Sequence, residues 1–175
     1  MRFFQNLILI IFMMFCFSCY NNSKEINRGY NVKVGEDAPK IDLLLLDGQL
    51  LTNENLKGKV VVIQFTASWC SVCIKEMPHL EKEVWQKFKN DDFLLVGVDL
   101  KEDLNVVESF IQKTVVTYPF AIDRDGSFFE SFTNPGAGVT RNIVIDKTGK
   151  ISFLTRLFDP KEFQEMIEHI EMLLK

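Results

Sequence analysis

Two cysteines lie two residues apart, directly between a predicted strand and a predicted helix. Residues 59–65 form a β-branched apolar run, typical of a strand buried on both faces, and residues 71–89 carry apolar side chains at helical spacing. Cys70 therefore lies at the helix cap, where unpaired N–H groups and the helix dipole favour a thiolate. Cys73 follows one turn later on the same side. This geometry predicts a redox disulfide, Cys70–Cys73, in which Cys70 attacks and Cys73 resolves.

The alternative for this pair is half of a zinc site. Zinc needs two further ligands, and the chain offers only His79 and His169 beside the cysteines. The histidines fall in the helix after the dithiol and in the last predicted helix, and the sequence contains no second C-x-x-C. The spacing therefore favours a redox dithiol with no metal.

The segment from Phe65 to Pro78 reads FTASWCSVCIKEMP and resembles the thioredoxin superfamily. More narrowly, its W-C-x-x-C-x-x-E-x-P pattern resembles the membrane-tethered TlpA/ResA-like thiol–disulfide oxidoreductases of the bacterial envelope, over roughly residues 36–158. The resemblance implies an α/β, thioredoxin-like fold with a central mixed sheet flanked by helices and an N-terminal β-hairpin extension. It also implies a protein-disulfide oxidoreductase that uses no cofactor.

The first 18 residues have the pattern of a secretory signal peptide. Arg2 is followed by an apolar run over residues 7–17, which is too short to span a bilayer. Ser18–Cys19 resembles the cleavage point of a lipoprotein, which would make Cys19 the lipidated first residue of the mature chain. An uncleaved signal anchor is the alternative. Both place the domain in the cell envelope, anchored to a membrane on the extracytoplasmic, periplasmic side.

The remaining chain is expected to form a tether and one domain. Residues 19–35 are polar and lack periodicity, which predicts a flexible tether, and residues 36–175 are expected to form one thioredoxin-like domain. With Cys19 modified and the signal peptide removed, only Cys70 and Cys73 remain as thiols. The 24 acidic residues outnumber the 20 basic ones, which argues against nucleic acid as a partner.

Other segments predict an alternation of strands and helices. Residues 41–46 and 49–52 indicate a β-hairpin around an Asp-Gly turn. An apolar run at 93–98 and helical spacing at 104–113 predict a parallel β-α-β unit with the strand before the dithiol. Strands are expected at 141–145 and 150–156, and a helix with one apolar stripe is expected from Pro160 onward.

Two polar residues are candidates for supporting the dithiol. Glu76 follows Cys73 by three residues, on the same helix face. A carboxylate there would raise the thiol pKa values and could take a proton from Cys73, and the alternative is an exposed helix glutamate. Gln64 lies in the strand beneath the site, where thioredoxin has an aspartate that helps to move protons. Because glutamine cannot titrate, Gln64 either supports the site without moving protons or hydrogen-bonds within the buried strand.

Two further residues of the motif are expected to act through packing. Pro78 lies five residues after Cys73, inside the predicted helix, and should kink it by removing a backbone donor. Trp69 is expected to pack beside the site and shield Cys70.

The resemblance places Thr140 where the family usually has a cis-proline that faces the dithiol. A cis bond before a non-proline residue costs about 2.5–4 kcal/mol, so we expect a trans Val139–Thr140 bond, or a strained cis bond held by its surroundings. The threonine hydroxyl could hydrogen-bond a cysteine sulfur. For Arg141 the sequence leaves two roles open, which are stabilising a thiolate and forming a surface salt bridge.

The leading prediction is a thiol–disulfide oxidoreductase that reduces disulfides in cell-envelope proteins. Ser71 and Val72 place no positive charge between the cysteines, and Glu76 adds a negative charge. Stabilising the thiolate is what makes a strong oxidant, and little beyond the helix terminus does so in this motif. Such a reductase needs electrons from a membrane donor.

Two other functions fit the sequence less well. Residues 141–146 also resemble peroxiredoxin-like peroxidases, which place a threonine three residues before the reactive cysteine, whereas Thr66 precedes Cys70 by four. The second is a non-enzymatic copper-binding or copper-delivery protein of the envelope. Such proteins usually have three residues between their cysteines and a distal histidine. This chain has two residues there and no histidine between His79 and His169.

Overall fold

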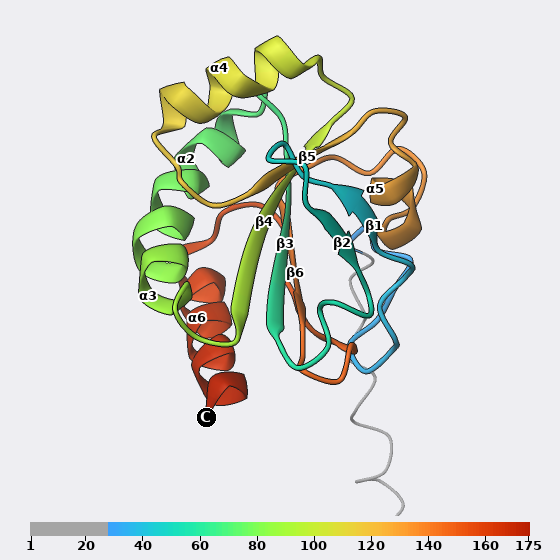
Figure 1. The fold of residues 1–175 in the computed structure, drawn as a ribbon, viewed down its shortest axis with the longest axis vertical. Coiled ribbons are helices and arrows are strands. Elements are labelled where there is room, and N and C mark those ends of the chain that lie inside the picture. The colour runs from blue at the N-terminus through green and yellow to red at the C-terminus, as the bar shows by residue number, and fades with distance from the viewer. Residues whose placement is uncertain (1–27) are drawn as a thin grey trace, which may run out of the picture.

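A mixed β-sheet of five strands forms the centre of the computed structural model, which describes residues 28–175. The predicted signal peptide, Cys19 and the first part of the predicted tether lie outside the described residues. In chain order the strands are β3 (Val60–Thr66), β4 (Phe93–Leu100), β5 (Phe120–Asp123), β6 (Arg141–Ile145) and β7 (Ile151–Leu154). Their order in the sheet is β5–β4–β3–β6–β7, with parallel pairing from β5 to β3 and antiparallel pairing from β3 to β7 (Figure 1). The expected central mixed sheet is confirmed.

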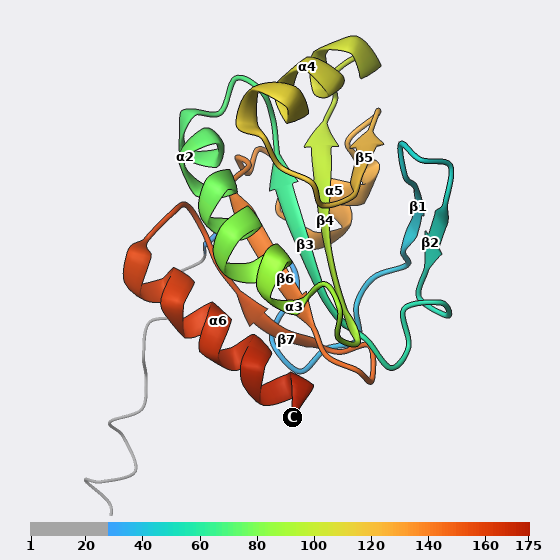
Figure 2. The same cartoon turned by 60° about the vertical axis from the view of Figure 1, so that its left-hand side comes forward.

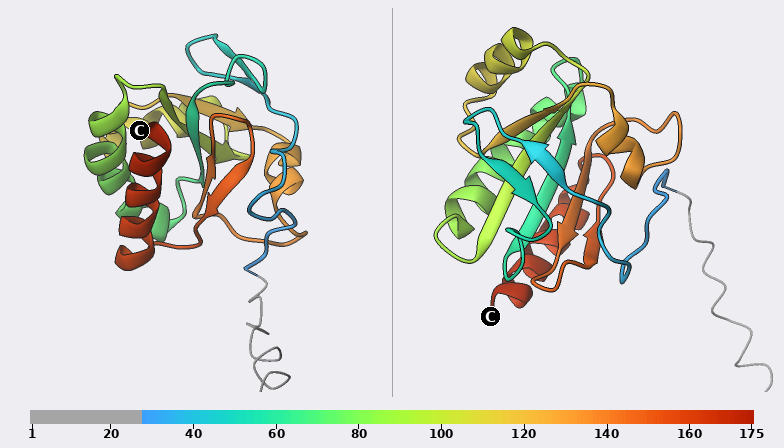
Figure 3. Two further views of the ribbon diagram at one scale, coloured as in Figure 1. Left: turned by 90° about the horizontal axis from the view of Figure 1, so that it is seen from below. Right: turned by 45° about the vertical axis from the view of Figure 1, so that its right-hand side comes forward.

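Both faces of the sheet are covered. One layer consists of α2 (Ser71–His79), α3 (Gln86–Phe88), α4 (Leu104–Thr114) and α6 (Pro160–Leu174). Their buried side chains form one hydrophobic cluster against the sheet, and Figure 2 shows α2, α3 and α6 on the same side. The opposite layer consists of α5 (Ser127–Phe132) and a hairpin of β1 (Asp42–Leu44) and β2 (Leu50–Thr52) (Figure 3). The predicted flanking helices and N-terminal β-hairpin are therefore confirmed.

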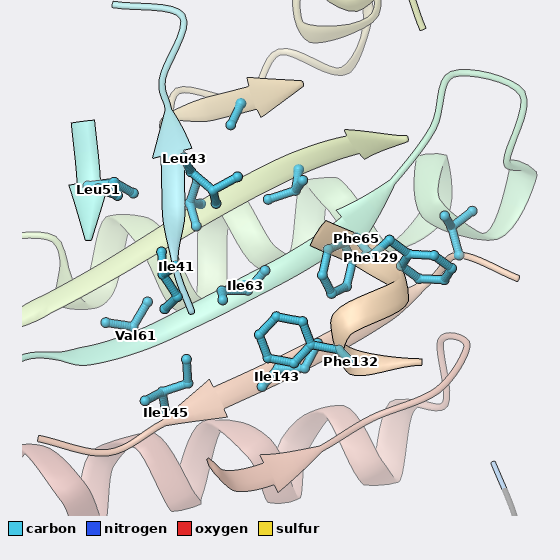
Figure 4. Packing of buried hydrophobic residues seen from close by; sticks show 14 of the residues in the cluster. Ile41, Leu43, Leu51, Val61, Ile63, Phe65, Phe129, Phe132, Ile143 and Ile145 are labelled. Carbon is cyan, nitrogen blue, oxygen red and sulfur yellow. The ribbon is translucent and has the colours of Figure 1, made fainter. Parts of the chain in front are cut away.

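Strand β3 is buried along its whole length and leads into the dithiol. Val61, Ile63 and Phe65 point into the hydrophobic cluster that includes the hairpin and α5 (Figure 4). Val60 and Val62 point into the cluster beneath the other helices. A continuous apolar run is required because both faces of this strand are covered. The strand ends at Thr66, and the loop from Ala67 leads to Cys70.

The predicted helix over residues 71–89 is one helical run with a change in its hydrogen-bond pattern. Helix α2 continues through Pro78 into a π-helical segment, η1 (Leu80–Trp85), and then into α3. Pro78 has no N–H to donate to the carbonyl four residues earlier, and the pattern widens directly after it. The expected disturbance at Pro78 is thus a change from α to π geometry inside a continuous helix (Figure 2).

The sequence patterns do not predict β5 and α5. Strand β5 has only four residues and α5 only six, too few for a clear periodicity. Helix α5 depends on one side chain from the end of β5. The Asp123 carboxylate accepts hydrogen bonds from the backbone N–H groups of Gly126, Phe128 and Phe129 at the start of that helix.

Residues 28–35 belong to the folded domain, which corrects the predicted tether of residues 19–35. The backbone N–H of Asn31 donates to the Phe132 carbonyl over 3.1 Å. The Tyr30 hydroxyl donates to the Thr155 carbonyl. The sequence pattern misleads because the segment is polar and aperiodic, while its partners lie far along the chain.

Among residues 28–175, no helix has the length and apolar character needed to cross a bilayer.

Candidate active site

The two cysteines are joined by a disulfide at the start of α2. Cys70 is the N-cap residue, with an extended backbone (φ −87°, ψ 101°), and Cys73 lies in the first helical turn. Their Cα atoms are 5.3 Å apart. The backbone N–H of Cys73 also points at the Cys70 sulfur, over 3.1 Å. The end of β3 and the start of α2 therefore produce the predicted disulfide geometry.

The two sulfurs differ in their access to solvent. Cys70 is 9% exposed, whereas Cys73 is 0% exposed. A substrate sulfur can therefore approach Cys70 but not Cys73. In the reduced protein, the Cys73 N–H and the positive end of the helix dipole favour a thiolate at Cys70. The geometry supports Cys70 as the attacking residue and Cys73 as the resolving one.

Thr140 lies against both sulfurs. Its hydroxyl oxygen is 3.0 Å from the Cys70 sulfur and 3.0 Å from the Cys73 sulfur. No cis peptide bond occurs among residues 28–175, so the bond from Val139 to Thr140 is trans, as expected. Thr140 has a positive φ of 66°, an uncommon conformation for a β-branched residue. The expected hydrogen bond from the threonine hydroxyl to a cysteine sulfur is consistent with these distances.

Glu76 is buried beneath the dithiol, so the alternative of an exposed helix glutamate is wrong. It is 1% exposed, and its carboxylate accepts hydrogen bonds from the Asn142 amide over 2.8 Å and the Gln64 amide over 3.4 Å. Burial raises the pKa of Glu76 to about 7, while these two hydrogen bonds oppose the rise. A carboxyl that titrates near neutral pH is suited to accepting and returning a proton.

Gln64 joins Glu76 to a residue that the sequence pattern does not identify. The Gln64 amide donates to Glu76, and its carbonyl oxygen accepts from the Tyr118 hydroxyl over 2.8 Å. Both bonds join Gln64 to residues outside β3, which is consistent with support of the site without proton transfer. The sequence offers a weak signal for Asn142, which is a polar residue inside the apolar strand β6. It offers none for Tyr118.

Trp69 and Arg141 flank the dithiol in different environments. Trp69 is 66% exposed, and its expected shielding of Cys70 stays a prediction. Arg141 is 1% exposed, which excludes a surface salt bridge. Its guanidinium donates to the carbonyl oxygens of Gly138 and Arg28, over 2.8 Å and 2.7 Å. The positively charged guanidinium of Arg141 is therefore paired with backbone carbonyl oxygens.

A carboxyl pair on the other side of the dithiol loop is also absent from the sequence-based prediction. Glu102 accepts two hydrogen bonds from Ser68, from its N–H over 2.5 Å and its hydroxyl over 2.6 Å. Asp99, at the end of β4, is 0% exposed. Burial, and then the nearby Glu102 charge, raise the pKa of Asp99 to about 8. Through its two bonds to Ser68, Glu102 holds the loop that leads from β3 to Cys70.

The zinc alternative lacks ligands in the described part of the chain. Residues 28–175 contain no group of three or more histidine, cysteine, aspartate or glutamate side chains placed to hold a metal ion. His79 contacts Glu83, with 2.7 Å between Nδ1 and Oε1. His169, on α6, packs against Phe153 of β7. Neither histidine contributes to the dithiol site.

Comparison with known proteins places this site in a family. The model of the Redoxin family matches residues 33–170, which is most of the chain. The chain belongs to the Redoxin family. The matched region contains the whole sheet and the dithiol at the start of α2.

The chain is similar to the thiol–disulfide oxidoreductase ResA of Bacillus anthracis. Identity is 30% over 121 residues, which cover 69% of this chain and 68% of the relative. A solved structure of a candidate protein disulfide isomerase from Bacteroides thetaiotaomicron is 47% identical, with a TM-score of 0.80, and covers 83% of this chain and 92% of that one. A solved structure of a candidate thiol:disulfide interchange protein DsbE from Chlorobium tepidum is 22% identical, with a TM-score of 0.69, and covers 82% of this chain and 99% of that one. This likeness supports the fold.

These relatives and the geometry of the dithiol identify the activity of this Redoxin family member. It is a thiol–disulfide oxidoreductase of the ResA-like group with a thioredoxin-like fold, as predicted. Its substrates are molecules that carry a disulfide. The peroxidase and copper-delivery alternatives are not favoured.

Proposed function

We propose that the protein reduces disulfides in cell-envelope proteins, with Glu76 as the proton acceptor for Cys73. The observation that carries the proposal is a buried carboxyl that titrates near neutral pH, one helical turn after the buried sulfur. A negative charge at that position disfavours thiolates, and a couple with little thiolate stabilisation is a reductant. No positively charged side chain lies between the cysteines to offset it.

The reaction proceeds in two exchange steps. The Cys70 thiolate attacks one sulfur of the substrate disulfide, forms a mixed disulfide and releases the other substrate sulfur as a thiolate that takes up a proton. Glu76 then accepts the Cys73 proton. The Cys73 thiolate attacks the Cys70 sulfur and releases the second substrate thiolate. The substrate gains two electrons, and the domain is left with the Cys70–Cys73 disulfide seen in the structure. A membrane dithiol donor must return the electrons.

The equilibrium potential of the Cys70–Cys73 couple tests the direction of electron flow. We expect a value near the roughly −270 mV of thioredoxin, measured at pH 7 against glutathione by trapping the reduced and oxidised forms. A value near the roughly −180 mV of protein disulfide isomerase would favour isomerisation. A value near the roughly −120 mV of a dedicated oxidant would reverse the proposed direction.

Attachment to a membrane through Cys19 is the second part of the proposal. Its support is the Ser18–Cys19 sequence after a short apolar run. We expect the full chain to incorporate a labelled fatty acid in cells and the Cys19→Ala variant to incorporate none. If both variants stay unlabelled but remain with the membrane fraction, the uncleaved signal anchor is the correct interpretation.

A further inference from the structure

The first residues of the folded domain, which we define as the N-terminal arm (residues 28–31), lie against the segment that carries Thr140. Tyr30 forms a β-bridge with Thr133. The Asn31 amide donates to two carbonyl oxygens near the end of α5, over 3.0 Å and 3.1 Å. The Arg28 side chain forms an ion pair with Glu162 of α6. The arm is thus fixed to two helices that are distant from it in sequence.

Arg141 connects the arm to the active-site segment. One guanidinium nitrogen donates to the Arg28 carbonyl over 2.7 Å, and another donates to the Gly138 carbonyl over 2.8 Å. The guanidinium also lies over the Tyr30 ring, 4.5 Å from its centroid. Gly29 approaches it so closely that an added Cβ would lie 2.7 Å from a guanidinium nitrogen. The arm therefore supplies a carbonyl, an aromatic face and a close backbone contact to one buried cation.

Thr140 needs this kind of support. A β-branched residue at a positive φ is strained, and such strain persists only where the surroundings over-determine the backbone. Two backbone hydrogen bonds hold Thr140, to the Phe65 carbonyl over 3.2 Å and from the Leu157 N–H over 2.9 Å. The Arg141 side chain closes the turn from Gly138 around Thr140. Because the arm holds Arg141, it also restrains the turn.

We propose that the N-terminal arm is a positioning element of the redox site, which holds the Thr140 hydroxyl against the two sulfurs through Arg141. The first residues of the domain thus take part in setting the redox behaviour of the dithiol. This proposal goes beyond the assigned oxidoreductase activity. It holds for either direction of electron flow, so it stands or fails independently of the proposed reductase function.

The effect on the dithiol has a definite sign. A hydroxyl donates a stronger hydrogen bond to a thiolate than to a disulfide sulfur, so Thr140 stabilises the reduced form more than the oxidised form. Displacing the hydroxyl raises the pKa of the Cys70 thiol and shifts the equilibrium toward the disulfide. A tenfold change in the equilibrium constant corresponds to about 30 mV.

Two glycines of the N-terminal region provide a matched test in the purified full chain. Gly29 and Gly35 have similar backbone angles, φ 80° and φ 94°, so alanine is strained at both. An added Cβ meets Arg141 at Gly29 but nothing within 4 Å at Gly35. We expect Gly29→Ala to shift the equilibrium constant against glutathione about fivefold toward the disulfide and to raise the pH midpoint of Cys70 alkylation. Gly35→Ala should leave both unchanged.

Thr140→Val sets the upper limit of the effect, because it keeps the branched shape and removes the hydroxyl. Gly29→Ala should change the equilibrium in the same direction and by a smaller factor. If Gly29→Ala proves unfolded by circular dichroism, Tyr30→Leu replaces it, since it removes the aromatic face under Arg141 and leaves the backbone intact. The proposal is wrong if the arm variants equal Gly35→Ala in both the equilibrium constant and the alkylation midpoint.

Discussion

Replacing Cys73 by serine is expected to convert the enzyme into a trap that stays covalently attached to its substrates. Cys70 can still attack a disulfide, but no second thiolate is present to release the partner. Turnover of a disulfide substrate should fall to background, while mixed disulfides accumulate in an envelope extract. Gel electrophoresis without and then with reductant detects them as partners that separate on reduction.

The matched control is Cys70→Ser, which should form no mixed disulfide. The reason is access, since Cys70 is 9% exposed and Cys73 is 0% exposed. If Cys70→Ser traps partners as well as Cys73→Ser does, then Cys73 is reached by substrates and the assigned roles are reversed. If Cys73→Ser keeps its turnover, resolution does not require this residue and the two-step reaction is incorrect.

Replacing Glu76 by glutamine should have the second-largest effect on activity. Without a proton acceptor, Cys73 must lose its proton to solvent, and we expect resolution to slow about a hundredfold at pH 7. The wild-type rate should fall as the pH drops below about 7, where burial leaves Glu76 protonated, according to its raised pKa. In the variant this acid limb should move to higher pH, because Cys73 then loses its proton to solvent, so the deficit relative to wild type should narrow as the pH rises. Single-turnover mixing experiments across this range measure both effects.

The same substitution should stabilise the fold at alkaline pH. Because the pKa of Glu76 is raised to about 7 in the folded state, the folded protein binds more protons than the unfolded one between about pH 4.5 and 7. Stability therefore falls as the pH rises through this window, by about 3 kcal/mol for this one buried group. Asp99, whose pKa is also raised, adds a similar trend that is present in both proteins.

Urea unfolding of wild type and Glu76→Gln at pH 5 and pH 8 isolates the contribution of this residue. The variant should gain stability over wild type only at the higher pH. Glu108→Gln is the control, because Glu108 is an exposed glutamate of α4. Equal effects of the two substitutions at both pH values would mean that the Glu76 carboxyl is not titrating in a buried site.

The sequence predicts those features of the site that depend on neighbouring residues. Burial of β3, the cap position of Cys70 and the placement of Glu76 all follow from periodicities of two or 3.6 residues. The contacts of Glu76 with Asn142 and of Gln64 with Tyr118 depend on the packing of separate elements, which no local pattern contains. Sequence could place the carboxyl on the correct helix face, but only the fold shows what surrounds it.

Arg141 shows the other limit of prediction from sequence. The sequence leaves two roles open for this arginine, a thiolate partner and a surface salt bridge, because charged side chains are rarely buried without partners. Its partners are the Arg28 carbonyl and the Tyr30 ring, from a polar segment whose sequence predicts a flexible tether. Neither the burial of Arg141 nor the docking of residues 28–31 follows from a local pattern, since the two segments contact each other across more than 100 residues of sequence.

Docking of residues 28–31 on the domain would limit how far a membrane-anchored form of the protein can work from the bilayer. If Cys19 carries the lipid, nine residue steps separate it from Arg28, and a fully extended chain of that length spans about 30 Å. The dithiol is then confined to a shallow zone above the bilayer, comparable in depth to the domain itself. In that case a substrate would have to come within this distance of the lipid surface to meet Cys70.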